Sequence, residues 1–221
     1  MKTWIVGLLT SLLLLGCSGG SGYEQAICVL VDVSGTYADE KAGVVKLLKR
    51  DILPRMVPGD TLMLVRIDSQ SYEKENLEVL VTLESRPSRA NAQKLALAQA
   101  LDAFAAEPGG SKFTDIPGAM MLGAEYLREV PSGSRVMLVF SDLAEDLPAG
   151  SKRTLSESEF EGIEVVAMNV KRLEKDARDP EVFRQRLSQW EERVIASKAE
   201  GWRTLLDPAK LAAVLDEVRR S

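Results

Sequence analysis

The feature that most constrains this chain is a continuous apolar run at residues 26–33, broken only by Asp32 near its end. A strand with apolar side chains on both faces must be covered on both sides, as central strands of parallel sheets are. Similar apolar runs recur and alternate with amphipathic stretches. This alternation predicts one α/β domain, with a doubly wound, mainly parallel sheet flanked by helices on both faces.

The predicted strands share near-continuous apolar character, and the predicted helices share an apolar stripe that repeats every three to four residues. We expect strands at residues 26–33, 60–68, 77–83, 135–140, 163–170 and 202–206, with 77–83 at the edge of the sheet. We expect helices at 40–56, 90–106, 115–129, 180–197 and 208–219. The charged segment 145–162 is expected to be a solvated connection or a short surface helix.

The N-terminus has the pattern of a signal peptide. Lys2 precedes an apolar stretch at residues 4–15, which is shorter than the roughly 17–25 residues needed to span a bilayer. The stretch ends in Leu-Leu-Gly-Cys17, which resembles the bacterial lipobox, where cleavage precedes a cysteine that is then lipidated. The alternative is a plain secretory signal with a chance cysteine.

The lipobox resemblance implies a three-part organisation of the chain. Residues 1–16 would be a lipoprotein signal peptide, and 17–24 would be the lipidated Cys17 and a Gly/Ser-rich flexible tether. Residues 25–221 would be the folded domain. The implied location is the bacterial cell envelope, and Ser18 after the cysteine favours the outer membrane facing the periplasm in a Gram-negative host.

Composition excludes several classes of function. The net charge of −5 is the opposite of the basic footprint of nucleic-acid binders, so no nucleic-acid partner is expected. The absence of histidine removes Ser-His-Asp catalysis, Cys-His proteolysis and histidine-ligated zinc. Once Cys17 carries lipid, Cys28 has no cysteine to pair with and is expected to be a small core residue.

Oxygen-bearing side chains occur at three places beside the ends of predicted elements. Asp32, Ser34 and Thr36 follow the first strand, Thr114 precedes a helix, and Asp142 follows the strand at 135–140. Ligands bind such sheets outside the carboxyl ends of the strands, where these segments are expected to meet. Oxygen donors without nitrogen or sulfur suit Mg²⁺, Ca²⁺ or Mn²⁺.

This set of residues resembles the von Willebrand factor type A domain and its metal-ion-dependent adhesion site. That family has Asp-x-Ser-x-Ser after the first strand, a Thr before a later helix and an Asp after the fourth strand. This chain has Asp32-Val-Ser34-Gly-Thr36, then Thr114, then Asp142, in the same order. Thr36 keeps the hydroxyl of the second Ser, whereas the Gly that commonly follows the last Asp is absent.

The resemblance implies a binding module and no enzyme. Its five metal ligands would be Asp32, Ser34, Thr36, Thr114 and Asp142, with Mg²⁺ as the expected ion and Ca²⁺ or Mn²⁺ as alternatives. In the family, one coordination position is left open for an Asp or Glu of a protein partner. The expected function is therefore metal-dependent binding of an acidic group by a protein held to the membrane through its lipid alone.

Other interpretations of the same residues stay open at this point. The domain could keep the fold, bind no metal and act as a scaffold or assembly protein. Asp32 could instead be the nucleophile of a haloacid-dehalogenase-like phosphatase, although Ser34 stands where that family has its second, proton-transferring Asp. Thr114 could be a helix N-cap, and Asp115 is expected to be a first-turn charge that favours the helix dipole.

Overall fold

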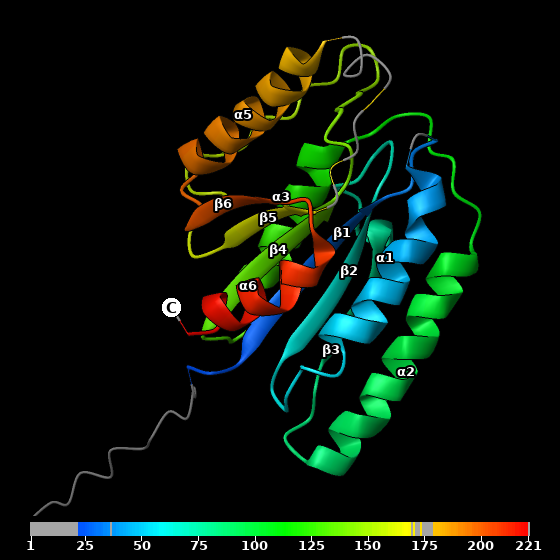
Figure 1. Ribbon diagram of the computed structural model, residues 1–221, viewed down its shortest axis with the longest axis vertical. Coiled ribbons are helices and arrows are strands. Elements are labelled where there is room, and N and C mark those ends of the chain that lie inside the picture. Colours follow the sequence, from blue (N-terminus) through cyan, green and yellow to red (C-terminus); the bar gives the residue numbers. More distant parts are fainter. Residues whose placement is uncertain (1–21, 36, 169, 171–172, 174–178, 221) are drawn as a thin grey trace, which may run out of the picture.

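The computed structural model describes residues 22–35, 37–168, 170, 173 and 179–220. Within this part of the chain six strands form one sheet in the order β3-β2-β1-β4-β5-β6 (Figure 1). The strands are β1 (Gln25–Asp32), β2 (Thr61–Ile67), β3 (Leu77–Thr82), β4 (Ser134–Phe140), β5 (Glu164–Met168) and β6 (Gly201–Leu205). Only the β2–β3 pair is antiparallel. The predicted mainly parallel sheet and its edge strand are confirmed.

Helices cover both faces of this sheet (Figure 1). They are α1 (Lys41–Leu47), α2 (Pro87–Ala106), α3 (Ile116–Glu129), α5 (Pro180–Ala196) and α6 (Leu211–Val218). Side chains of α1, α2 and α6 pack in the core on one face, and those of α3 and α5 pack in the core on the other. The predicted two-sided covering is therefore confirmed.

The central strand β1 shows why its sequence is apolar throughout. All eight of its residues are buried. Val29 belongs to the core beneath α1 and α2, and Cys28 belongs to the core beneath α3. A Cβ added to Gly123 of α3 would lie 2.7 Å from the Cys28 Sγ. The small residue therefore lets α3 pack directly on β1, and Cys28 is a core residue, as predicted.

Two predicted segments differ from the structure in detail. The helix expected at 40–56 is α-helical only over α1 and continues as a π-helical turn at Leu48–Ile52. The segment 145–162 contains no helix, so the surface-helix alternative for it is wrong. Gly150 and Gly162 in this segment have φ values of 85° and 75°, a left-handed conformation that interrupts a regular helix.

The strand order places a reversal at the centre of the sheet. The chain runs outward from β1 to β3 on one side, and from β4 to β6 on the other. Crevices at such a reversal, outside the carboxyl ends of the strands, are where doubly wound folds bind ligands. Across the described residues, no helix combines the length and apolarity needed to cross a membrane.

Candidate metal centre

Asp32, the last residue of β1, lies at the centre of the carboxyl edge and is completely buried. Its Oδ1 accepts a hydrogen bond from the backbone N–H of Ser34 at 2.8 Å. Its Oδ2 accepts one from the hydroxyl of Ser141 at 2.7 Å. Ser141 follows the end of β4, so this second bond joins the two strands at which the sheet order reverses.

The loop after α2 meets the same end of β1. The backbone N–H groups of Gly110 and Ser111 both donate to the carbonyl of Val33, at 2.8 and 3.2 Å. Ser34 and Ser111 also form an isolated parallel bridge. These contacts bring the loop that carries Thr114 alongside the Asp32 motif.

The loop that carries Thr114 also meets the loop that follows β4. Thr114 and Asp146 form an antiparallel bridge, in which each backbone N–H donates to the other's carbonyl at 2.7 and 3.1 Å. Each of the three segments therefore contacts the other two. Asp32, Ser34, Thr114 and Asp142 are all buried at this meeting point. The fifth predicted ligand, Thr36, and the predicted lipidation site, Cys17, lie outside the described residues.

The residue after Asp142 takes the conformation that a glycine would adopt easily. Leu143 has a φ of 60°, in the left-handed region that is unfavourable for residues with a side chain. Its N–H donates to the Ser141 hydroxyl at 3.0 Å, and its carbonyl accepts from the Trp190 indole at 2.9 Å. Leu143 is also buried in the core. Packing therefore gives this loop a left-handed turn without the glycine common in the family.

The electrostatics of Asp32 are those of a carboxylate short of positive charge. Burial raises the pKa of Asp32, hydrogen bonds from Ser34 and Ser141 oppose this, and the charge of Asp142 raises it further. No Lys or Arg in the described part of the chain forms an ion pair with Asp32. The Asp142 charge thus acts on Asp32 in a buried setting, where a proton or a bound cation would relieve the repulsion.

The donors at this edge fit a hard divalent cation. They are carboxylate and hydroxyl oxygens from Asp32, Ser34, Thr114 and Asp142, and Mg²⁺ keeps several waters and needs few protein ligands. A bound cation would supply the positive charge that the buried Asp32 carboxylate lacks among the described side chains. No group of three or more His, Cys, Asp or Glu arranged to hold a metal occurs in the described residues. The candidate site differs from such a group because it has only two carboxylates, and its other donors are hydroxyls.

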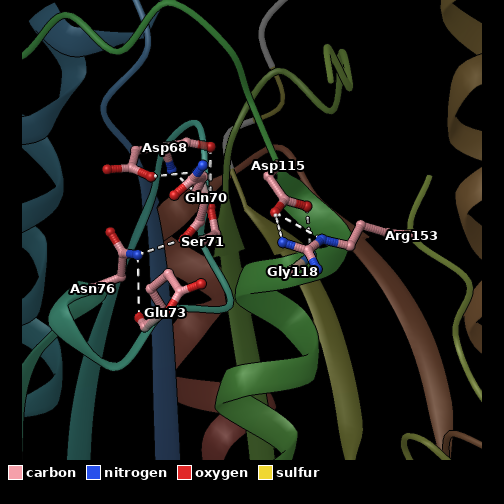
Figure 2. A network of polar contacts seen from close by, with 8 residues as sticks. All are labelled: Asp68, Gln70, Ser71, Glu73, Asn76, Asp115, Gly118 and Arg153. Atoms are coloured by element: carbon pink, nitrogen blue, oxygen red, sulfur yellow. Dashed lines mark hydrogen bonds and ion pairs between the residues drawn. The ribbon is translucent and has the colours of Figure 1, made fainter. Parts of the chain in front are cut away.

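Thr114 is not the N-cap of the helix that follows it, so the N-cap alternative for this residue is wrong. Asp115 is the N-cap of α3, and its Oδ1 accepts from the Gly118 N–H at 2.9 Å. The predicted favourable interaction of Asp115 with the helix terminus is thus made by direct capping. Oδ2 of Asp115 accepts from Arg153 (Figure 2), and the Asp115 N–H donates to the Asp68 carbonyl.

Sequence reasoning missed the residues that hold the candidate ligands. Ser141 bonds Asp32, Asp146 bridges Thr114, and Trp190 holds the loop after Asp142. The position of Ser141, directly before Asp142 at a strand end, was the available signal for the first. The other two depend on long-range contacts, for which the sequence contains no local pattern.

Comparison with known proteins gives similarity at the level of the fold. No protein-family model matches the sequence, and no curated protein is similar to it. The pilus adhesin SpaC from Lactobacillus rhamnosus GG, in its open conformation, is 16% identical with a TM-score of 0.53, covering 89% of this chain and 30% of that one. The PilB minor pilin from Streptococcus sanguinis is 9% identical with a TM-score of 0.52, covering 90% and 61%.

A third similar structure is a von Willebrand factor type A protein from Catenulispora acidiphila, 15% identical with a TM-score of 0.47, covering 89% of this chain and 42% of that one. The chain thus spans between 30% and 61% of the length of these three proteins. The pilus adhesin and the minor pilin share with this chain a doubly wound, mainly parallel α/β fold, the fold class that the sequence predicted.

Proposed function

We propose that this protein is a binding module that uses a divalent cation, Mg²⁺ in the first instance, to bind an acidic group of a protein partner. The observation that carries the proposal is the meeting of three chain segments around the buried Asp32, which has no Lys or Arg partner among the described residues. A buried carboxylate without a counter-charge costs folding free energy, so a role beyond stability accounts for its place at the ligand-binding edge.

The five candidate ligands would contribute two kinds of oxygen donor to the metal. Asp32 and Asp142 would supply negative charge, and Ser34, Thr36 and Thr114 would supply neutral hydroxyl oxygens. Because only two of these donors are anionic, a bound dication would keep net positive charge and attract a carboxylate of the partner. The backbone contacts between the three segments hold the donors before any ligand arrives, which lowers the entropic cost of binding.

Titration calorimetry with MgCl₂ on the folded domain tests this proposal. We expect wild type to bind one Mg²⁺ and Asp32→Ala and Asp142→Ala to bind none that is detectable. Asp68→Asn is a matched control, because Asp68 follows the neighbouring strand β2, is not a candidate ligand, and accepts a local bond from the Gln70 N–H on its Oδ1. Wild type without heat of binding for Mg²⁺, Ca²⁺ or Mn²⁺ would favour the metal-free scaffold instead.

A phosphatase mechanism receives less support than binding. Asp32 is completely buried and both of its oxygens accept hydrogen bonds, from Ser34 and from Ser141. A nucleophile would need an oxygen free to approach phosphorus, and Ser34 offers no acid-base group at neutral pH. Turnover of a phosphate ester that disappears in Asp32→Asn would overturn this preference.

We further propose that the domain is held at the bacterial cell envelope by lipid on Cys17. Similarity to a pilus adhesin and a minor pilin is in keeping with an envelope role, although it concerns the fold alone. Labelling with a lipid precursor should mark wild type and fail to mark Cys17→Ser. Affinity capture of envelope proteins with and without Mg²⁺, using Asp142→Ala as the control, would then search for the acidic partner.

A further inference from the structure

The junction between Thr114 and Asp115 is fixed by backbone hydrogen bonds from two other loops. Thr114 exchanges two bonds with Asp146, at 2.7 and 3.1 Å. The N–H of Asp115 donates to the carbonyl of Asp68 at 2.7 Å. The loop that contains Asp68 has its own internal hydrogen bond, in which the Asp68 N–H donates to the Ser71 hydroxyl at 2.8 Å (Figure 2).

A side-chain contact from the same region adds to these backbone bonds. The Nε of Arg153 donates to Oδ2 of Asp115 at 3.0 Å, and its Nη2 lies 3.0 Å from the same oxygen. The other oxygen of Asp115, Oδ1, accepts from the Gly118 N–H and caps α3, so the two oxygens have different partners. The Asp115 side chain is 1% exposed and that of Arg153 is 32% exposed. Figure 2 shows the guanidinium reaching the carboxylate at the start of α3.

Both ends of one loop therefore hold the same junction. We call residues 146–153 the clamp loop: it begins at the Asp146 backbone bridge and ends at the Arg153 ion pair. Between them a turn is closed by the Ser151 N–H, which donates to the Pro148 carbonyl at 2.9 Å. The clamp loop belongs to the connection between β4 and β5. This connection carries the candidate ligand Asp142 and, through Asp146, contacts the candidate ligand Thr114.

We infer that Arg153 is a positioning residue that holds Thr114 in place for the metal site through its ion pair with Asp115. The inference rests on the proposed function, since only there is Thr114 a ligand. Without the guanidinium, the Asp146 bridge would be the remaining hydrogen-bonded contact between the clamp loop and the junction within the described residues. The buried Asp115 carboxylate would also lose its charge partner, which favours rearrangement of the junction.

The test compares Arg153→Ala and Arg153→Lys with wild type in two measurements. The first is the Mg²⁺ dissociation constant by calorimetry, and the second is amide hydrogen exchange of Thr114 in the metal-free protein by NMR. Arg128→Ala is a matched control. Arg128 Nη1 donates to the Glu159 carbonyl, so it anchors the same long segment at the other end of α3.

We expect Arg153→Ala to weaken Mg²⁺ binding about 10- to 100-fold, the usual range for residues that orient metal ligands. Thr114 should exchange faster in this variant, while Val29 in the core of β1 keeps its protection. Arg153→Lys should recover part of the loss, because lysine keeps the charge but lacks the planar fork. Arg128→Ala should leave both measurements at wild-type values.

The two proposals fail in different ways. Wild type that binds no Mg²⁺ refutes the metal site, and the Thr114 exchange in Arg153→Ala still decides the positioning role. Unchanged Thr114 exchange overturns that role, and so does a uniform rise at Thr114 and Val29, which would mean general destabilisation. If Arg153→Ala fails to fold, the same two readouts on Arg153→Lys decide.

Discussion

Two aspartates, Asp60 and Asp32, are completely buried at opposite edges of the same sheet, and they differ in the charge of their partners. Asp60, just before β2 at the amino edge, receives the Arg219 guanidinium on both oxygens, at 2.8 and 2.6 Å. The N–H groups of Gln25 and Val57 add one bond to each oxygen. Asp32 at the carboxyl edge accepts its hydrogen bonds from Ser34 and Ser141, which are neutral donors.

The difference separates a carboxylate with a structural ion pair from the carboxylate that we propose as a metal ligand. The charge of Asp60 is neutralised by Arg219 of α6's C-terminal end, so the pair ties the last helix to the sheet. The charge of Asp32 has no Lys or Arg partner in the described part of the chain, and the nearby charge of Asp142 raises the pKa of Asp32 further. Such local conflicts with stability are expected where a protein binds something.

The largest effect is expected at the amino edge. Asp60→Asn leaves the Arg219 guanidinium, 11% exposed, without its charge partner. Breaking a buried ion pair from one side typically costs about 3–5 kcal/mol. Urea unfolding of the variant should show a loss of that size, with no change in Mg²⁺ affinity. A loss below about 1 kcal/mol would contradict the assignment of Asp60 as structural.

A smaller loss of stability is expected from a substitution in the core between α3 and β1, away from both edges. Gly123→Ala places a methyl group 2.7 Å from the Cys28 Sγ, closer than side chains pack, and overpacking of a core costs about 1–3 kcal/mol. The loss should be the same with and without Mg²⁺, since the contact belongs to neither edge. The double variant Gly123→Ala with Cys28→Ala should recover part of it, and failure to do so would show that another neighbour is the obstacle.

At the carboxyl edge the expected effect has the opposite sign. Because burial raises the pKa of Asp32 above the unfolded value of about 3.9, ionisation of Asp32 opposes folding. Stability of the metal-free protein should therefore fall as pH rises from that value through the folded pKa. Asp32→Asn should lack this fall and be more stable than wild type at pH 7 without metal. Lower stability of the variant across that window would contradict the account.

The smallest net effect is expected at Leu143, because two contributions oppose each other. Leu143→Gly removes the left-handed backbone cost, about 1–2 kcal/mol, at a φ of 60°. It also removes a buried leucine worth about 1.5–3 kcal/mol. A net loss of about 1 kcal/mol in thermal or urea unfolding is expected, with Mg²⁺ binding retained. Abolished Mg²⁺ binding would mean that the leucine side chain itself is needed to hold Asp142.

Most of the fold could be predicted because its strands are buried on both faces and therefore have nearly continuous apolar sequences. Periodicity did not predict the π-helical turn at Leu48–Ile52 or the irregular segment 145–162, where local geometry departs from the repeat. The three ligand-bearing segments could be predicted from their positions at element ends. The contacts of Ser141 and Arg153 could not, since they join residues 109 and 38 positions apart.

The most direct measurement is the free energy of unfolding in urea with and without saturating MgCl₂, for wild type, Asp60→Asn and Asp32→Asn. A ligand at 100 times its dissociation constant adds about 2.7 kcal/mol to the stability of the state that binds it. We predict this gain for wild type and for Asp60→Asn, despite the lower starting stability of the latter, and no gain for Asp32→Asn. An equal gain in Asp32→Asn, or none in wild type, would contradict a cation site at Asp32.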